Sequence, residues 1–337
     1  MKALSLIGFT LAALLFSGCS SKKYFEPEQT YSASNALSSY GGSIVDLSRD
    51  GGTLASGQYV GKDGISSINL GEGYRFISES GKYVLAGNTE GNLKVIDKNT
   101  KETDRVVSLK IPVVSATIHN GVIAYVLNNN SFGIYQMSGN RKLVESRSES
   151  TFAIDTRAAS PMFIDNLVVM PMLDGKLIIV SVADSENAKV VYISYEKAFN
   201  NIIYLARKGN TMIAATPTKL LTLGDGGQRE YREKISEVAY ENGVIYLFTK
   251  EGKIIALDKK LDVIGESKYK FAHYSAGTVS NGKVYALEQG GSLIVMDSVL
   301  TKHKIYDVGE VDEAAYIAGT KLYKDGEIIE MSKLGYE

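Results

Sequence analysis

A β-hairpin pattern that recurs about every 40 residues limits what this chain can fold into more than any other feature. Its clearest copy covers residues 242–267, where Asn242 and Gly243 precede two short apolar runs at 244–248 and 254–257. An Asn-Gly pair favours a tight turn with positive φ, and short apolar runs on either side of a second turn are typical of paired strands. Because a lone hairpin cannot bury its apolar face, the repeats are expected to pack against one another.

Eight copies of this hairpin can be traced along the chain. They open at or near Gly52, Gly81, Gly121, Asn166, Asn210, Gly243, Gly282 and Gly319, and the last seven are 33 to 45 residues apart. Further strand-like runs between the hairpins raise the number to about four strands per repeat, which is the make-up of a propeller blade. The pattern therefore predicts an all-β fold over residues 43–337. This fold is a β-propeller of four-stranded blades, with eight blades as the first expectation and seven as the alternative.

The ring needs a strand from the start of the chain. The last repeat ends at Glu337 with too few residues for a fourth strand. A propeller normally closes its ring with a strand from the other terminus. Residues 31–47 are therefore predicted to supply the missing strand.

The first residues have the composition of an export signal. Lys2 precedes a mostly apolar stretch that is too short to span a bilayer permanently, and small residues lead up to Cys19, the only cysteine of the chain. This arrangement predicts a lipoprotein signal peptide over 1–18 and acylation of Cys19, with an ordinary secretory signal as the alternative. By resemblance to Gram-negative lipoproteins, Ser20 implies an outer-membrane location facing the periplasm. Residues 19–42 are polar and serine-rich, which predicts a lipidated N-terminus and a flexible tether.

Charge and motif content exclude several functions. Without Lys2, 36 basic side chains face 38 acidic ones, and no basic stripe occurs, so nucleic acid is not an expected partner. Since Cys19 is the only cysteine, the domain can hold no internal disulfide. His119, His273 and His303 stand in no metal-binding spacing, and the chain has no GxSxG, P-loop or GxGxxG motif. The sequence therefore predicts no catalytic residue, no metal, no cofactor and no small-molecule substrate.

Weaker patterns are interpreted structurally. Residues 97–102 resemble the start of a calcium loop but lack its central glycine and terminal glutamate, and residues 194–197 match SxxK without a partner motif. Met162, Met170 and Met172 are assigned to the core rather than to an adaptable binding surface. Tyrosines near strand ends are candidates for anchoring a protein partner, although the core is the safer assignment for most tyrosines. They are Tyr195, Tyr204, Tyr231, Tyr274 and Tyr316.

The repeats resemble those of a known family. Residues 242–258 follow the form Asn-Gly-apolar-Tyr-apolar, then Gly-x-apolar-x-Ala-Leu-Asp, with good copies at 281–297 and 80–97. This form is similar to the repeats of pyrroloquinoline-quinone-type propellers. Behind a lipoprotein signal, such a propeller resembles the BamB family of outer-membrane lipoproteins. The resemblance implies an eight-bladed, non-catalytic scaffold that assists assembly and insertion of β-barrel outer-membrane proteins, with the barrel-assembly machine as its partner.

The chain departs from that family in having no tryptophan, a residue that commonly docks neighbouring blades. Aliphatic, phenylalanine and tyrosine side chains are expected to take its place. Because the match is one of repeat style, no partner-contact residue can be transferred to this chain. One alternative is a scaffold or accessory lipoprotein of another envelope machine, for secretion, motility or adhesion. A remote alternative is a quinoprotein dehydrogenase, but that resemblance implies a tryptophan, a calcium loop and a cysteine pair, for which the sequence has no candidates.

Overall fold

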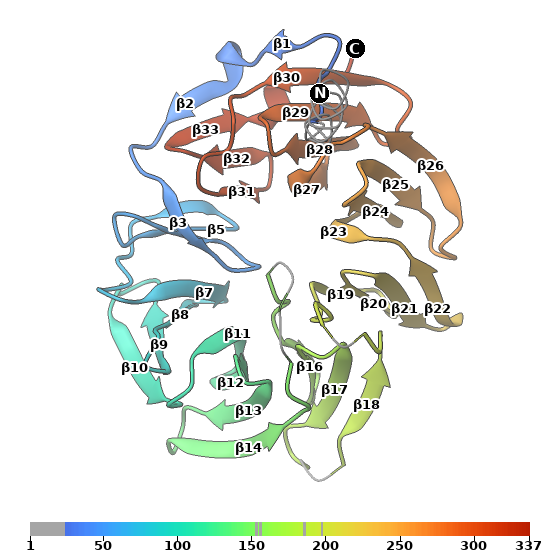
Figure 1. The fold of residues 1–337 in the computed structure, drawn as a ribbon. Coiled ribbons are helices and arrows are strands. Elements are labelled where there is room, and N and C mark those ends of the chain that lie inside the picture. The colour runs from blue at the N-terminus through green and yellow to red at the C-terminus, as the bar shows by residue number, and fades with distance from the viewer. Residues whose placement is uncertain (1–23, 152–153, 155–156, 185–186, 197) are drawn as a thin grey trace, which may run out of the picture.

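Eight sheets surround a common axis, as the repeat predicted (Figure 1). The computed structural model describes residues 24–151, 154, 157–184, 187–196 and 198–337. Each sheet is one blade of four strands, except that blade 7 has a fifth strand. The fold is an all-β, eight-bladed β-propeller, so the first expectation is confirmed.

Within blades 1 to 7 the strands run in chain order from the axis to the rim (Figure 1). Blades 1 to 4 comprise β3 (Ile44–Leu47), β4 (Gly52–Leu54), β5 (Tyr59–Gly61) and β6 (Gly64–Ser66); β7 (Arg75–Ser80), β8 (Tyr83–Gly87), β9 (Asn92–Asp97) and β10 (Thr103–Ser108); β11 (Val113–His119), β12 (Val122–Leu127), β13 (Ser131–Gln136) and β14 (Arg141–Arg147); and β15 (Met162–Ile164), β16 (Leu167–Pro171), β17 (Lys176–Ser181) and β18 (Lys189–Tyr192). Blades 5 to 7 comprise β19 (Tyr204–Lys208), β20 (Thr211–Thr216), β21 (Lys219–Gly224) and β22 (Gly227–Arg232); β23 (Ile235–Glu241), β24 (Val244–Thr249), β25 (Lys253–Leu257) and β26 (Val263–Lys268); and β27 (Tyr274–Ser280), β28 (Lys283–Glu288), β29 (Ser292–Asp297) and β30 (His303–Asp307). Blade 8 comprises β31 (Ala315–Ala318), β32 (Lys321–Lys324), β33 (Glu327–Glu330) and, at the rim, β2 (Leu37–Ser39).

The repeated hairpin forms the two middle strands of each blade. In blade 6, Asn242 and Gly243 have φ values of 50° and 90°, which is the left-handed pair that a two-residue hairpin turn needs. The strands on either side of the second turn, β24 and β25, are buried at every position except the first. The rim strand β26 is exposed at four of its six positions. The apolar runs of the sequence therefore mark the strands that are covered on both faces by neighbouring blades.

Blade contacts use aliphatic and tyrosine side chains, as the absence of tryptophan led us to expect. One core cluster joins blades 5 and 6 through residues such as Ile213, Ile245 and Leu247. In the next cluster Tyr246 of blade 6 is 2% exposed, and its hydroxyl donates to the carbonyl of Ser298 in blade 7 at 2.9 Å. Burying an aromatic side chain of this size contributes about 1.5–3 kcal/mol. Tyrosine thus fills the space and satisfies its own hydroxyl.

The start of the chain closes the ring, as predicted for residues 31–47. Leu37–Ser39 (β2) pairs antiparallel with β33 and completes blade 8, whereas Ile44–Leu47 (β3) opens blade 1. Tyr31–Ser32 (β1) adds a parallel strand to the outer edge of blade 7. Two short 3-10 segments, η1 (Ser34–Ala36) and η2 (Met331–Lys333), lie beside this closure. In the part of the chain that the structure describes, no helix is long and apolar enough to cross a membrane.

The predicted tether over 19–42 differs from the structure in its second half. Residues 31–39 are strands and a 3-10 turn of the ring rather than a flexible coil. Ala33 and Ala36 of this segment are buried in the core, whereas all three residues of β2 are exposed and that strand is held by backbone pairing. Before them, Phe25 packs edge-on against Tyr269, which lies between β26 and β27, at 5.9 Å between ring centroids. The fold therefore includes residues before position 43.

Candidate functional site

Three charged side chains from different blades meet at the axis. Arg49 lies in the β3–β4 turn of blade 1, Arg157 precedes β15 of blade 4, and Glu237 lies on β23 of blade 6. Arg49 pairs with one carboxylate oxygen of Glu237, and Arg157 pairs with the other at 3.1 Å. The three side chains are 14%, 20% and 10% exposed, respectively. Blades that are far apart around the ring are therefore tied together across its centre.

A second polar group extends this axial network. The Ser160 hydroxyl donates to the Asp50 carboxylate, and the Tyr316 hydroxyl donates to the Asp50 carbonyl at 2.9 Å. Burial raises the pKa of Asp50, while the Ser160 hydrogen bond and the Arg49 charge oppose that shift. Burial also raises the pKa of Tyr204 to about 12.

The two arginines of the network respond differently to burial. Burial disfavours the charged form of Arg49, but the adjoining Glu237 carboxylate outweighs it and raises the pKa. For Arg157 burial is the larger effect and lowers the pKa, although Glu237 opposes it. Both guanidiniums share the carboxylate of Glu237, and Arg49 is stabilised further by the nearby charge of Asp50.

The axial network leaves only small spaces beside it. A cavity of about 380 Å³ is lined by Asp50 and Ser160, and a second of about 220 Å³ is lined by Arg157 and Glu237. Arg49 and Tyr316 line both cavities. These volumes lie at or below the lower end of what small-molecule pockets span.

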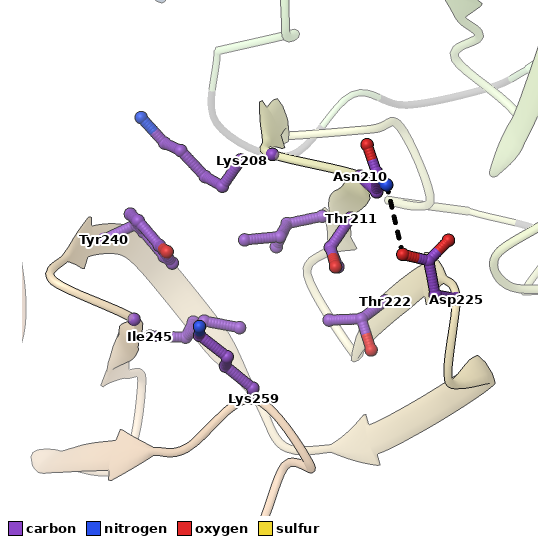
Figure 2. A pocket seen from close by; sticks show the side chains of 11 residues that line it. Lys208, Asn210, Thr211, Thr222, Asp225, Tyr240, Ile245 and Lys259 are labelled. Carbon is purple, nitrogen blue, oxygen red and sulfur yellow. Dashed lines mark hydrogen bonds between the residues drawn. The ribbon is translucent and has the colours of Figure 1, made fainter.

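A larger groove lies between blades 5 and 6, on the face that carries the turns between the first and second strands of each blade (Figure 2). Its volume is about 630 Å³. The inner strands of these two blades pack against each other less extensively than those of blades 6 and 7. The floor and walls are formed by Ile213, Ile245, Thr211, Thr222 and Tyr240, with Asn210 and Asp225 at one end and Lys208, Gly243 and Lys259 at the rim.

The two rim lysines give the groove a positive border. The Lys208 ammonium lies 5.2 Å from the centroid of the Tyr240 ring, and the Lys259 stem lies over Gly243. Within the described residues, neither ammonium forms an ion pair with a carboxylate. At the opposite end Asn210 donates to Asp225 at 3.1 Å, so the negative charge there is already engaged (Figure 2). The groove is therefore apolar in the middle, cationic on one side and weakly anionic on the other.

The residues singled out from the sequence are scattered. Cys19, the predicted lipidation site, lies outside the described residues. The His119 ring lies 5.5 Å from the ring of Phe163 on blade 4, and the His303 ring lies 5.4 Å from that of Tyr269, both measured between ring centroids. His273 is exposed on blade 7. Among the described residues no group of three or more His, Cys, Asp or Glu side chains could hold a metal ion.

The tyrosines and methionines singled out from the sequence lie partly in the core and partly at surfaces or cavities. Met170 and Met172 are fully buried, as the core assignment predicted, whereas Met162 is half-buried and lines the axial cavity. Of the tyrosines considered as partner anchors, Tyr195 is 76% exposed, whereas Tyr274 is buried. Tyr204 and Tyr316 line the axial cavity instead of an outer loop. Sequence reasoning missed the axial charges and the groove lysines, because both sites combine residues of separate blades.

The eight sheets place this protein in the class of eight-bladed β-propellers. No protein-family model matches the chain. The chain is 28% identical to the plasminogen-binding protein PgbB of Helicobacter pylori strain J99, over 93% of this chain and 66% of the relative. The same protein from strain 26695 is 27% identical over the same shares. The chain thus spans slightly less than two thirds of the curated relatives that it matches.

Solved structures show the same architecture at low identity. BamB from Moraxella catarrhalis superposes with a TM-score of 0.65 at 12% identity, covering 87% of this chain and 98% of that one. The C-terminal WD40 domain of Sif2 gives 0.63 at 12% identity with the same coverage. The resemblance to a BamB-like fold is thereby confirmed at the level of fold alone.

Proposed function

We propose that this protein is a non-catalytic β-propeller that binds other proteins at the bacterial envelope, anchored in the outer membrane by lipid on Cys19. One observation carries the proposal: the similarity to a protein named for binding another protein runs along 93% of the chain. The axis supports it, because the buried side chains there are engaged with one another. A surface groove, rather than a central active site, is then the place for recognition.

The first partner to test is plasminogen, which the name of the relatives specifies. A second candidate is the machine that assembles β-barrel outer-membrane proteins, favoured by the fold shared with BamB. The two differ in where the partner comes from, since plasminogen is an external protein and the assembly machine belongs to the envelope itself. Another envelope complex, for secretion, motility or adhesion, fits the same anchored propeller.

One experiment separates these candidates. The full-length protein is crosslinked in intact cells of its source organism, with and without added plasminogen, and the captured proteins are identified. Enrichment of plasminogen over serum albumin supports the first candidate, and enrichment of barrel-assembly subunits supports the second. Capture of no protein above the level of an unrelated lipoprotein control would overturn the proposal. Turnover of a reducible dye after addition of the quinone and calcium would instead establish a dehydrogenase.

The anchor has a separate test. Cys19→Ala removes the acylated thiol, so the protein should fold normally and move from the membrane to the soluble fraction, because several acyl chains are needed for stable anchoring. Fractionation followed by a high-salt wash measures the distribution, and Ser20→Ala is the matched control. A Cys19→Ala protein that stays in the washed membranes would contradict the lipid anchor.

A further inference from the structure

We propose that the groove between blades 5 and 6 binds an acidic segment of a protein partner, with a carboxylate held at the Asn242-Gly243 turn between Lys208 and Lys259. The inference deepens the proposed function and rests on it, since it takes the occupant to be a protein. It assigns a chemistry to the partner segment, namely a carboxylate next to an apolar side chain.

The protein itself binds a carboxylate at the equivalent turn of the next blade. Glu241, the last residue of β23, reaches across the boundary between blades 6 and 7. Its Oε1 accepts from the backbone N–H of Asn281 at 2.8 Å, and its Oε2 accepts from the N–H of Gly282 at 2.8 Å. Hydrogen bonds to a charged acceptor are about twice as strong as neutral ones. The Asn-Gly turn of this propeller is thus a two-pronged carboxylate site.

The boundary between blades 5 and 6 has the same turn without that carboxylate. Lys208 pairs with Thr211 at the end of β19, as Glu241 pairs with Val244 at the end of β23, so the two residues hold equivalent positions in their blades. An ammonium cannot accept a hydrogen bond. Within the described residues, the backbone N–H groups of the Asn242-Gly243 turn consequently have no acceptor in the protein.

The two turns match closely in backbone conformation. Asn242 and Gly243 have φ values of 50° and 90°, and Asn281 and Gly282 have φ values of 54° and 72°. Successive N–H groups in such a turn point to one side and create a small site for an anion. Since Gly243 lines the groove, a carboxylate bound to this turn lies inside it.

The surrounding charges favour an incoming acid. Lys208 and Lys259 both line the groove and are exposed, and neither has a carboxylate partner among the described residues. A carboxylate at the turn would lie beside the Lys259 ammonium in addition to the backbone donors, and Lys208 adds a second positive charge to the groove lining. The anionic end at Asp225 disfavours a second acid there, which fixes the direction of the bound segment.

The apolar middle of the groove specifies what accompanies the acid. Ile213, Ile245 and Tyr240 line this part of the groove, and Figure 2 shows the Tyr240 side chain beside Ile245. The volume of about 630 Å³ accommodates a short stretch of peptide with an aliphatic or aromatic side chain. An acidic residue followed by an apolar one satisfies both halves of the site.

Binding is measured by fluorescence anisotropy on the purified full chain. The probe is a short fluorescein-labelled peptide in which two glutamates precede a leucine and a phenylalanine, and the same peptide with glutamines is the ligand control. The decisive variant is Lys208→Glu, which places the protein's own carboxylate where Glu241 stands in blade 6. It should occupy the Asn242-Gly243 turn from within, weakening peptide binding at least tenfold without lowering Tm.

The control variant is Lys260→Glu, which makes the same charge change beside Lys259 but outside the groove lining. It should change affinity by less than about twofold, because a solvent-exposed charge is largely screened at physiological salt. Equal losses in Lys208→Glu and Lys260→Glu would overturn the proposal, since they would show a general charge effect. Absence of binding by the wild type, or equal binding of the glutamine peptide, would overturn it as well.

Different results would overturn the groove assignment and the proposed function. If wild type and Lys208→Glu capture the same proteins equally in cells, the groove assignment is overturned and the proposed function stands. If the wild type binds the acidic peptide but captures no protein in cells, the proposed function is overturned, while the carboxylate preference of the groove stands.

Discussion

Glu237 is expected to be the most sensitive single position at the axis. Glu237→Leu removes the acceptor of both Arg49 and Arg157, whose side chains are only 14% and 20% exposed. Removing one partner of a buried ion pair costs about 3–5 kcal/mol, because it leaves an uncompensated charge behind. Cavities of about 380 and 220 Å³ adjoin the network and are large enough to admit water, which reduces the cost. The expected loss of unfolding free energy is therefore about 3 kcal/mol, at the lower end of this range.

Urea unfolding at pH 7, followed by circular dichroism, measures this loss. With an m-value of about 3 kcal/mol per molar, a loss of this size moves the midpoint by about 1 M. The triple variant Arg49→Leu, Arg157→Leu and Glu237→Leu is the control, and it should recover part of the loss because neither guanidinium is then left buried without Glu237. The recovery is incomplete because the Asp50 carboxylate loses Arg49 as its neighbouring charge. A Glu237→Leu midpoint within experimental error of wild type would refute the reasoning, since it would mean that water solvates both guanidiniums at the axis.

Three further changes test other parts of the ring. Glu241→Gln leaves one N–H of the Asn281-Gly282 turn without its charged acceptor, so the unfolding free energy should fall by about 1 kcal/mol; a melting temperature equal to that of the wild type would argue against a contribution from these two hydrogen bonds. Asp50→Asn should raise the melting temperature at pH 7, because burial raises the pKa of Asp50 and its ionised form therefore costs stability above its ordinary pKa. This gain should shrink as the pH falls toward about 4 and disappear below it, where Asp50 is protonated in both the folded and the unfolded state, and a gain that is independent of pH would contradict the sign. Deleting residues 24–42 removes β1 and β2, which should lower the melting temperature by more than about 5 °C, and an unchanged melting curve would show that the ring closes without them.

The hairpins could be predicted because their signals are local. Asn242 and Gly243 predict the type of turn, and the apolar runs beside them predict the strands that neighbouring blades cover. Repetition then supplies the architecture, since each blade needs a neighbour on both sides. The rim strands carry less pattern, and β2 at Leu37–Ser39 carries none, because it faces solvent and is held by its backbone.

The sites could not be predicted in the same way. Arg49, Arg157 and Glu237 meet because the blades that carry them all face the central axis of a closed ring. The spacing of these residues in the sequence does not predict that contact. One feature of the groove is visible in the sequence, because an alignment of the repeats places Lys208 at the position that Glu241 holds in the next repeat. A change from acid to base at one repeat position becomes informative only when the structure shows what the acid does.

The pairing of β2 with β33 also has a consequence for how the protein is made. Ser38 and Ile328 are partners that lie 290 positions apart, so β2, which is synthesised early, can pair only after β33, the last strand of the ring, has been made. Closing a loop of this length is slow, since the entropy of joining the ends must be lost before any contact rewards it. Until the final hairpin is complete, blade 8 has no rim strand and its edge can pair with other chains. A chain truncated before β33 therefore lacks the strand that pairs with β2, so its ring stays open and the edge of β32 is left unpaired.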